Sequence, residues 1–197
     1  MRGVEEETEL ETVLVASVRD RPQYEGKWLT QIAEMLDLPP LEAARRVIAE
    51  DPGAVAVFFS MDEADVRRVM RHPLCMIGSD GIPSPTGKPH PRLYGTFPRV
   101  LGSYVREEGL LSLEEAVHKM SGLPGRRFGL GERGELREGW SADLVVFDPA
   151  TVEDRATYEE PRQYPSGIEY VIVNGLVAAE GGRQTAARAG RALRRDA

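Results

Sequence analysis

The chain has 197 residues, of which 41% are hydrophobic, and its formal net charge is -7. This length suffices for one domain, or for one domain with a small appendage. The acidic balance argues against a general nucleic-acid-binding protein, because such proteins neutralise phosphates with a basic surface. The single cysteine, Cys75, excludes an internal disulfide and favours a reducing compartment.

Membrane and export signals are weak in this sequence. No apolar run approaches the ~18 residues that a membrane span needs. Acidic residues, rather than a basic and then apolar leader, follow Met1, and we expect this acidic stretch, residues 1–11, to be frayed. We therefore expect a cytoplasmic protein with no membrane partner.

The first third of the chain alternates predicted strands and helices. Alternating valines predict a strand over residues 12–18. Apolar residues at helical spacing predict helices over residues 26–36 and 41–48. The continuous apolar run at 54–59 suits a buried strand, and residues 62–70 fit a short helix.

The stretch from Met76 to Gly81 has the pattern of a strand end followed by a turn that carries a candidate catalytic carboxylate. An apolar strand is predicted from Leu74 to Ile77, and it runs into a small polar turn that carries Asp80. Enzymes of the α/β class usually place their chemistry at the C-terminal ends of buried strands. Asp-Gly pairs also form turns readily, so spacing alone leaves Asp80 open to a purely structural interpretation.

A long loop, predicted over residues 82–98, follows this turn. It contains five prolines, which limit the entropy of the chain and favour an ordered loop. Long loops without regular structure tend to be functional or disordered. Because this loop carries His90 and Arg92 close to Asp80 in sequence, we interpret it as half of an active site.

Helices and then short β segments are predicted for the rest of the chain. Residues 97–105 are expected to be helical, and Ser112 and Glu115 form a capping box that starts a helix running to about residue 120. A further short helix is predicted within residues 121–128. From Gly129 onward, strands are predicted over 143–147 and 167–173, with a hairpin turn at Asn174-Gly175 leading into a returning strand over 176–180.

Two motifs together carry a resemblance to a known family. The stretch 76–81 and the loop from Pro89 to Gly102, Pro-His-Pro-Arg-Leu-Tyr-Gly-Thr-Phe-Pro-Arg-Val-Leu-Gly, closely resemble the N-acyl-D-amino-acid deacylases (D-aminoacylases) of the amidohydrolase superfamily. The loop motif is specific. The resemblance continues through residues 113–116, 120–124 and 139–148, and ends near Val173-Asn174-Gly175.

This resemblance implies an α/β fold: the C-terminal portion of the (β/α)8 barrel of a metal-dependent hydrolase, followed by a small β-sandwich segment. A complete barrel takes ~250 residues, so the chain corresponds to the last part of such an enzyme only. The expected parts are a partial β/α barrel with a helical insertion over residues 1–129, a small β-domain segment over 130–181, and a flexible basic tail over 182–197.

The resemblance also assigns roles to the two candidate site residues. It implies that Asp80 contacts a catalytic zinc ion, takes a proton from the attacking water and delivers it to the leaving nitrogen. It implies that Arg92 binds the α-carboxylate of an N-acyl-D-amino acid, because a guanidinium forks onto a carboxylate. His90, between two prolines, is expected to be structural, with a supporting role near the site as the alternative.

The departures from the family pattern concern the metal. The sequence has no His-x-His pair and only three histidines, whereas zinc takes three or four ligands. We therefore expect the chain to bind zinc, and to cleave the amide, only with the missing N-terminal ligands. Its expected partners are the substrate and either that N-terminal barrel portion or a second copy of itself. The alternatives are a non-catalytic assembly or binding module, and a hydrolase of another cyclic or linear amide.

Overall fold

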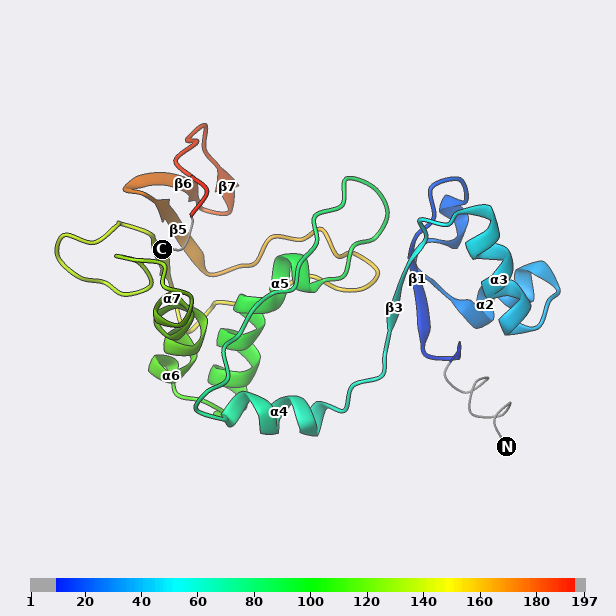
Figure 1. Cartoon of the computed structure of the whole chain (residues 1–197), viewed down its shortest axis with the longest axis horizontal. Coiled ribbons are helices and arrows are strands. Elements are labelled where there is room, and N and C mark those ends of the chain that lie inside the picture. The colour runs from blue at the N-terminus through cyan, green and yellow to red at the C-terminus, as the bar shows by residue number, and fades with distance from the viewer. Residues whose placement is uncertain (1–9, 194–197) are drawn as a thin grey trace. The chain divides into compact units, whose positions relative to one another are not determined.

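A computed structural model describes residues 10–193, and these fold into two compact units (Figure 1). Each unit is built from segments that lie far apart in the sequence. Of the described residues, unit 1 contains 10–63, 80–93 and 157–162. Unit 2 contains residues 64–79, 94–156 and 163–193.

Unit 1 is built on a three-stranded antiparallel sheet with the strand order β2-β1-β3. The central strand β1, Val13–Ser17, pairs with β2, Lys27–Trp28, and with β3, Val55–Phe58. The predicted strands at 12–18 and 54–59 are thus confirmed. The expected burial of the second one is wrong, because Val55 and Phe58 are 55% and 66% exposed on this edge strand.

The two faces of β1 are covered differently. Val13 and Val15 point to the face that packs against the helices α2, Leu29–Leu36, and α3, Pro40–Glu50 (Figure 1). Leu14 and Ala16 point to the other face, where they cluster with Val57 of β3 and with Tyr158 from a distant part of the chain. The alternation of side chains along a strand therefore gives the sheet one helix-covered face and one face that holds Tyr158.

Unit 2 begins with helices around an apolar core. They are α4 (Glu63–Arg71), α5 (Arg92–Arg99), the π-helical η2 (Val100–Glu107), α6 (Leu113–Val117), η3 (His118–Gly122) and α7 (Leu123–Phe128). The first residue of α4 and the first two of α5 belong to unit 1. Their core includes Met70, Val100, Tyr104 and Ala116, together with Val152. The predicted capping box is confirmed, since the backbone N of Glu115 donates to Ser112 Oγ at 3.1 Å and Glu115 accepts from the backbone N of Ser112 at 2.9 Å.

A four-stranded antiparallel sheet completes unit 2. Its order is β4 (Leu144–Phe147), β5 (Ile168–Val173), β6 (Leu176–Glu180) and β7 (Arg183–Gln184). The predicted hairpin is confirmed: Asn174 and Gly175 have φ values of 47° and 80° between β5 and β6. The predicted division into 1–129, 130–181 and 182–197 stays a prediction. Residues 1–9 of the acidic stretch and 194–197 of the basic tail lie outside the described residues.

The predicted strand from Leu74 to Ile77 is wrong in this structure. A strand needs a neighbour for its ladder of hydrogen bonds. Here the backbone N of Ile77 instead donates to the carbonyl of Lys119, at 3.1 Å, and that of Cys75 donates to the carbonyl of His72. Among the described residues, no helix or strand is formed between α4 and α5.

The predicted extent of the loop is also wrong at its far end. Helix α5 starts at Arg92, five residues earlier than predicted, and Pro98 lies inside it. Pro91 precedes the first turn, where a proline is tolerated because the first N–H groups of a helix have no partner within the helix. The loop therefore ends where α5 begins, at Arg92. Within residues 10–193, no helix combines the length and the apolar character needed to cross a bilayer.

Candidate active site

Asp80 adopts a backbone conformation that few residues with side chains adopt. Its φ is 47°, in the left-handed region, which aspartate enters more readily than most residues because its short side chain can bond locally. Its side chain is 78% exposed. The turn predicted at Ser79-Asp80-Gly81 is not formed, but the left-handed backbone of Asp80 presents its carboxylate to solvent.

Arg92 holds this carboxylate directly. Its Nη2 lies 2.8 Å from Asp80 Oδ2, and its Nε donates to the backbone carbonyl of Asp80 at 2.9 Å. A single guanidinium therefore contacts both the side chain and the backbone of Asp80. The structure brings the two predicted site residues together across a loop of eleven residues.

A hollow of about 450 Å³ is lined by Arg92 but not by Asp80. Strand β3 and the loop provide apolar walls, including Val57, Phe58 and Ile82, while Lys88, His90 and Arg92 supply nitrogen groups. Ligand sites typically combine such apolar walls with a few placed polar groups. The chemistry of the hollow therefore suits a small anion with an apolar body, such as the carboxylate of an acylated amino acid.

The middle of the loop that leads to Arg92 is hydrogen-bonded to β1. The backbone N of Lys88 donates to the carbonyl of Ala16 at 2.7 Å. Gly87 has a φ of +68°, and a Cβ there would lie 2.5 Å from Ser17 Cβ, so only glycine fits this close approach. Nη2 of Arg162 donates to the carbonyls of Ser84, Thr86 and Gly87 at 2.9, 3.0 and 3.1 Å.

His90 is hydrogen-bonded to the backbone of Arg92. Its Nδ1 accepts a hydrogen bond from the backbone N of Arg92 at 3.1 Å, and its Nε2 lies 3.3 Å from Tyr158 Oη. Burial lowers the pKa of His90 below its ordinary value of 6.5, and the charge of Arg92 lowers it further, while Asp80 opposes this shift. The neutral imidazole is thus the form that this site favours.

We expect His90 to titrate below pH 6.5 in the folded chain, and NMR of the imidazole resonances, assigned by their loss in His90→Asn, measures the midpoint. The unfolded chain takes up this proton at a higher pH than the folded chain does. The free energy of unfolding should therefore decrease as the pH falls from 6.5 through the midpoint of folded His90. A midpoint at or above 6.5 would contradict the burial and charge effects described.

The side chains of residues 10–193 do not make a complete zinc site. Among residues 10–193, His, Cys, Asp and Glu side chains nowhere form a group of three that could hold a metal ion. His72 accepts from the backbone N of Leu74, and His118 contacts Arg126, so these two histidines have other partners in unit 2. Asp80 supplies one carboxylate where zinc takes three or four ligands.

Similarity to known proteins places the chain in a family. The sequence model of the amidohydrolase family matches residues 31–179. The chain belongs to the amidohydrolase family. It is 50% identical over 176 residues to the N-acyl-D-glutamate deacylase of Alcaligenes xylosoxydans xylosoxydans, and this match covers 89% of the chain and 35% of the relative. The chain thus spans about a third of the length of this amidohydrolase.

Solved amidohydrolase structures share the fold. A D-aminoacylase structure superposes with a TM-score of 0.85 at 45% identity, covering 93% of this chain and 38% of that one. The N-acyl-D-glutamate deacylase of Bordetella bronchiseptica, solved with zinc and a phosphonate mimic of the tetrahedral intermediate, gives a TM-score of 0.82 at 45% identity. That match covers 90% of this chain and 37% of the other. The α/β fold of this amidohydrolase chain is therefore similar to that of the matched part of the D-aminoacylase structures.

Two residues near the site escaped the sequence interpretation. Tyr158 contacts His90, and Arg162 fastens the loop at residues 84–87. Both lie at least 68 positions from their partners, and no local pattern marks them. Their contacts depend on the tertiary fold of the amidohydrolase, so spacing could not have identified them.

Proposed function

We propose that this chain supplies Asp80 and Arg92 to the active site of an N-acyl-D-amino-acid deacylase. The contact of Asp80 with Arg92, which lines an anion-suited hollow, carries the proposal. The similarity to deacylases over most of the chain supports it. The chain would form the C-terminal portion of a (β/α)8 barrel and a small β-domain, and act with the remaining part of the enzyme in the cytoplasm.

The proposed reaction is hydrolysis of the amide between an acyl group and a D-amino acid. The C–N bond breaks, the oxygen of water joins the acyl carbon, and a carboxylate and a free D-amino acid leave. Asp80 takes one proton from the water and delivers it to the departing nitrogen. The second proton of the water is lost as the new carboxylic acid ionises and protonates the free amine, so protons balance over the cycle. Its exposure and its contact with Arg92, which lines the hollow, suit this transfer.

Arg92 fixes the substrate for that step. A guanidinium binds a carboxylate through two parallel N–H···O bonds, which orients the stereocentre and the scissile amide. In the structure the carboxylate of Asp80 lies against Nη2 of Arg92. We infer that the substrate carboxylate replaces it there, which turns Asp80 toward the amide. Binding and activation of the base would thus be coupled.

Zinc is the proposed cofactor, since a related deacylase was solved with it. The described residues do not form its site, and Asp80 is the one proposed ligand from this chain. We infer that the other ligands come from the part of the enzyme that this chain does not span. The 197-residue chain by itself would then be inactive.

The decisive experiment joins this chain to the N-terminal portion of a related deacylase that it does not match. We expect this chimera to bind zinc and to release free amino acid from one or more of N-acetyl-D-glutamate, N-acetyl-D-aspartate and N-acetyl-D-leucine, but not from the L-forms. The 197-residue chain assayed alone is the control. A folded, zinc-loaded chimera without turnover would refute the proposal, and turnover of a cyclic amide instead would favour another amidohydrolase activity.

Arg92→Lys is expected to weaken substrate capture more than chemistry. Lysine keeps the charge but loses the fork, so we expect KM to rise about 10- to 100-fold, the equivalent of a charge-assisted hydrogen bond, with kcat less affected. Arg99→Lys is the matched control, because Arg99 is exposed at the other end of α5. An unchanged KM in Arg92→Lys would argue against the carboxylate role.

A further inference from the structure

We propose that His90 and Tyr158 form a clamp that positions Arg92 for the carboxylate of the substrate. The clamp is a new element of the same site, and it rests on the proposed function of Arg92. It consists of two contacts: the backbone N of Arg92 to His90 Nδ1 at 3.1 Å, and His90 Nε2 to Tyr158 Oη at 3.3 Å. All three residues belong to unit 1.

The first contact determines the tautomer of His90. A backbone N–H can only donate, so Nδ1 must present its lone pair to Arg92. The proton of the neutral ring is then on Nε2, which points at the Tyr158 hydroxyl and can donate to it. The His90 ring therefore accepts a hydrogen bond from the amide of Arg92 at Nδ1 and donates one to Tyr158 from Nε2.

His90 also shapes the start of α5. The first N–H groups of a helix have no partner inside it. His90 provides acceptors for two of them, because its Nδ1 takes the N–H of Arg92 and its carbonyl takes that of Leu93 at 3.1 Å. The hydrogen bond thus holds the backbone N of Arg92, the atom next to its Cα, at the point where an irregular loop becomes a helix.

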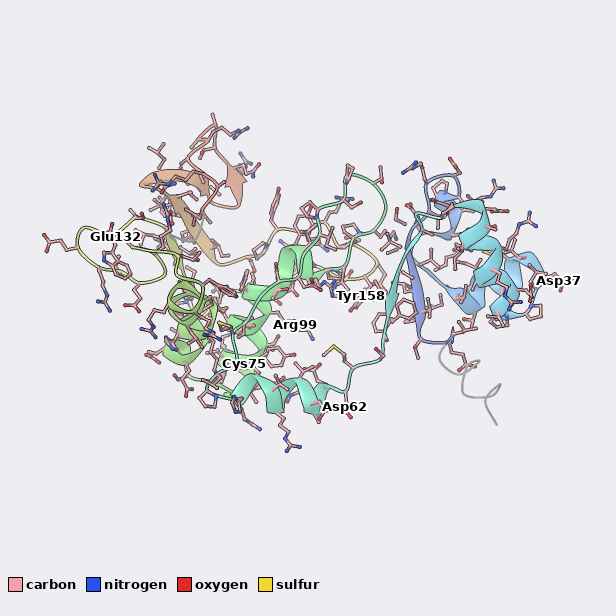
Figure 2. The ribbon with its side chains drawn as sticks, viewed as in Figure 1. Asp37, Asp62, Cys75, Arg99, Glu132 and Tyr158 are labelled. Carbon is pink, nitrogen blue, oxygen red and sulfur yellow. The ribbon has the colours of Figure 1, made fainter. Side chains whose placement is uncertain are left out.

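Tyr158 anchors the clamp to the sheet of unit 1. Its ring lies 4.7 Å from that of Phe59, whose ring lies 5.1 Å from that of Trp28 at the end of β2. Tyr158 also packs against the cluster of Leu14, Ala16 and Val57 on β1 and β3, and Figure 2 shows it beside these strands. The rings of His90 and Tyr158 meet nearly edge-to-face, at 5.3 Å and 74°. A series of packed rings therefore joins the sheet to His90, and a hydrogen bond joins His90 to Arg92.

This anchorage matters because Arg92 must bind in one geometry. Its side chain is 40% exposed, and the residue follows a loop without helix or strand. A forked bond to a carboxylate is lost by small displacements, so the residues behind a binding group determine how well it binds. His90 and Tyr158 act on the backbone of Arg92, and although His90 also lines the hollow, the clamp gives both residues a positioning role.

The test uses the chimeric deacylase and the N-acetyl-D-amino acid that it hydrolyses fastest. His90→Leu removes both contacts, and we expect KM to rise about tenfold while kcat changes less than about twofold, since two ordinary hydrogen bonds are lost. Tyr158→Phe removes one contact and should raise KM about threefold. Tyr164→Phe is the matched control: the ring of Tyr164 packs on Tyr94 in unit 2, and KM should stay unchanged.

His90→Asn is the rescue variant. An asparagine side chain accepts a hydrogen bond from the backbone N–H two residues on, as His90 Nδ1 does for Arg92. We expect its KM to lie within about twofold to threefold of the parent value, well below that of His90→Leu. An unchanged KM in His90→Leu, or equal defects in the Leu and Asn variants, would overturn the clamp.

NMR of the unmodified 197-residue chain separates failure of the clamp from failure of the proposed function. We expect ¹⁵N correlations of His90 to show a protonated Nε2 and an unprotonated Nδ1, with a scalar coupling from Nδ1 to the amide of Arg92. A proton on Nδ1 would overturn the clamp whatever the chimera does. A chimera without deacylase activity, with this NMR signature intact, would instead refute the proposed function alone.

Discussion

Replacing Asp80 by asparagine in the chimeric deacylase is expected to lower kcat by about 10²- to 10⁴-fold, the usual contribution of a general base. The amide has nearly the shape of the carboxylate but cannot take a proton from water. Arg92 would lose its ion-pair partner at 2.8 Å, so it should bind the substrate carboxylate at least as well as before. We therefore expect an unchanged or lower KM, measured with kcat from the release of free D-amino acid.

A matched control for this change exists in the same unit. Asp37 is another aspartate with a left-handed backbone, with a φ of 52° against 47° for Asp80 (Figure 2). Asparagine adopts this region as readily as aspartate does, so neither change strains the backbone. Asp37→Asn should leave kcat and KM unchanged. Full turnover in Asp80→Asn would exclude the base role and leave Asp80 with a structural role alone.

Signals that act over a few residues predicted the fold well. The Ser112–Glu115 capping box and the Asn174-Gly175 hairpin formed as expected, because each depends on backbone geometry within its own segment. The helix that became α2 is found near its predicted place for the same reason, since one apolar face directs it to the sheet.

Signals that need distant partners did not suffice. Leu74 to Ile77 has the composition of a buried strand, but strand pairing depends on a neighbour that composition does not specify. The candidate site likewise contains residues that a local motif identifies and a residue that only the tertiary fold brings there. Asp80 and Arg92 were found through a motif within one loop, and the structure places them in contact. Tyr158 reaches His90 only through the tertiary fold, and its position in the sequence gives no hint of this.

The largest expected loss of stability is at Gly167. This residue has a φ of +72°, and a Cβ there would overlap the backbone of Thr151 and Val152. Backbone atoms cannot rotate away as a flexible side chain can, and Val152 is fully buried in the core of unit 2. We expect Gly167→Ala to lower the free energy of unfolding by about 3 kcal/mol or more, combining left-handed strain with overpacking. Urea denaturation of the chain measures it.

Gly175→Ala separates the two contributions. Gly175 has a similar φ of +80°, but nothing lies within 4 Å of the position that a Cβ would take there. This variant should cost only about 1 to 2 kcal/mol, the strain of a left-handed alanine. The difference between the two variants is then the cost of forcing apart Gly167 and Val152, next to the bridge between Glu153 and Ser166. Equal costs would mean that this close approach is not required, whereas a larger cost at Gly167 would show that it contributes to the stability of unit 2.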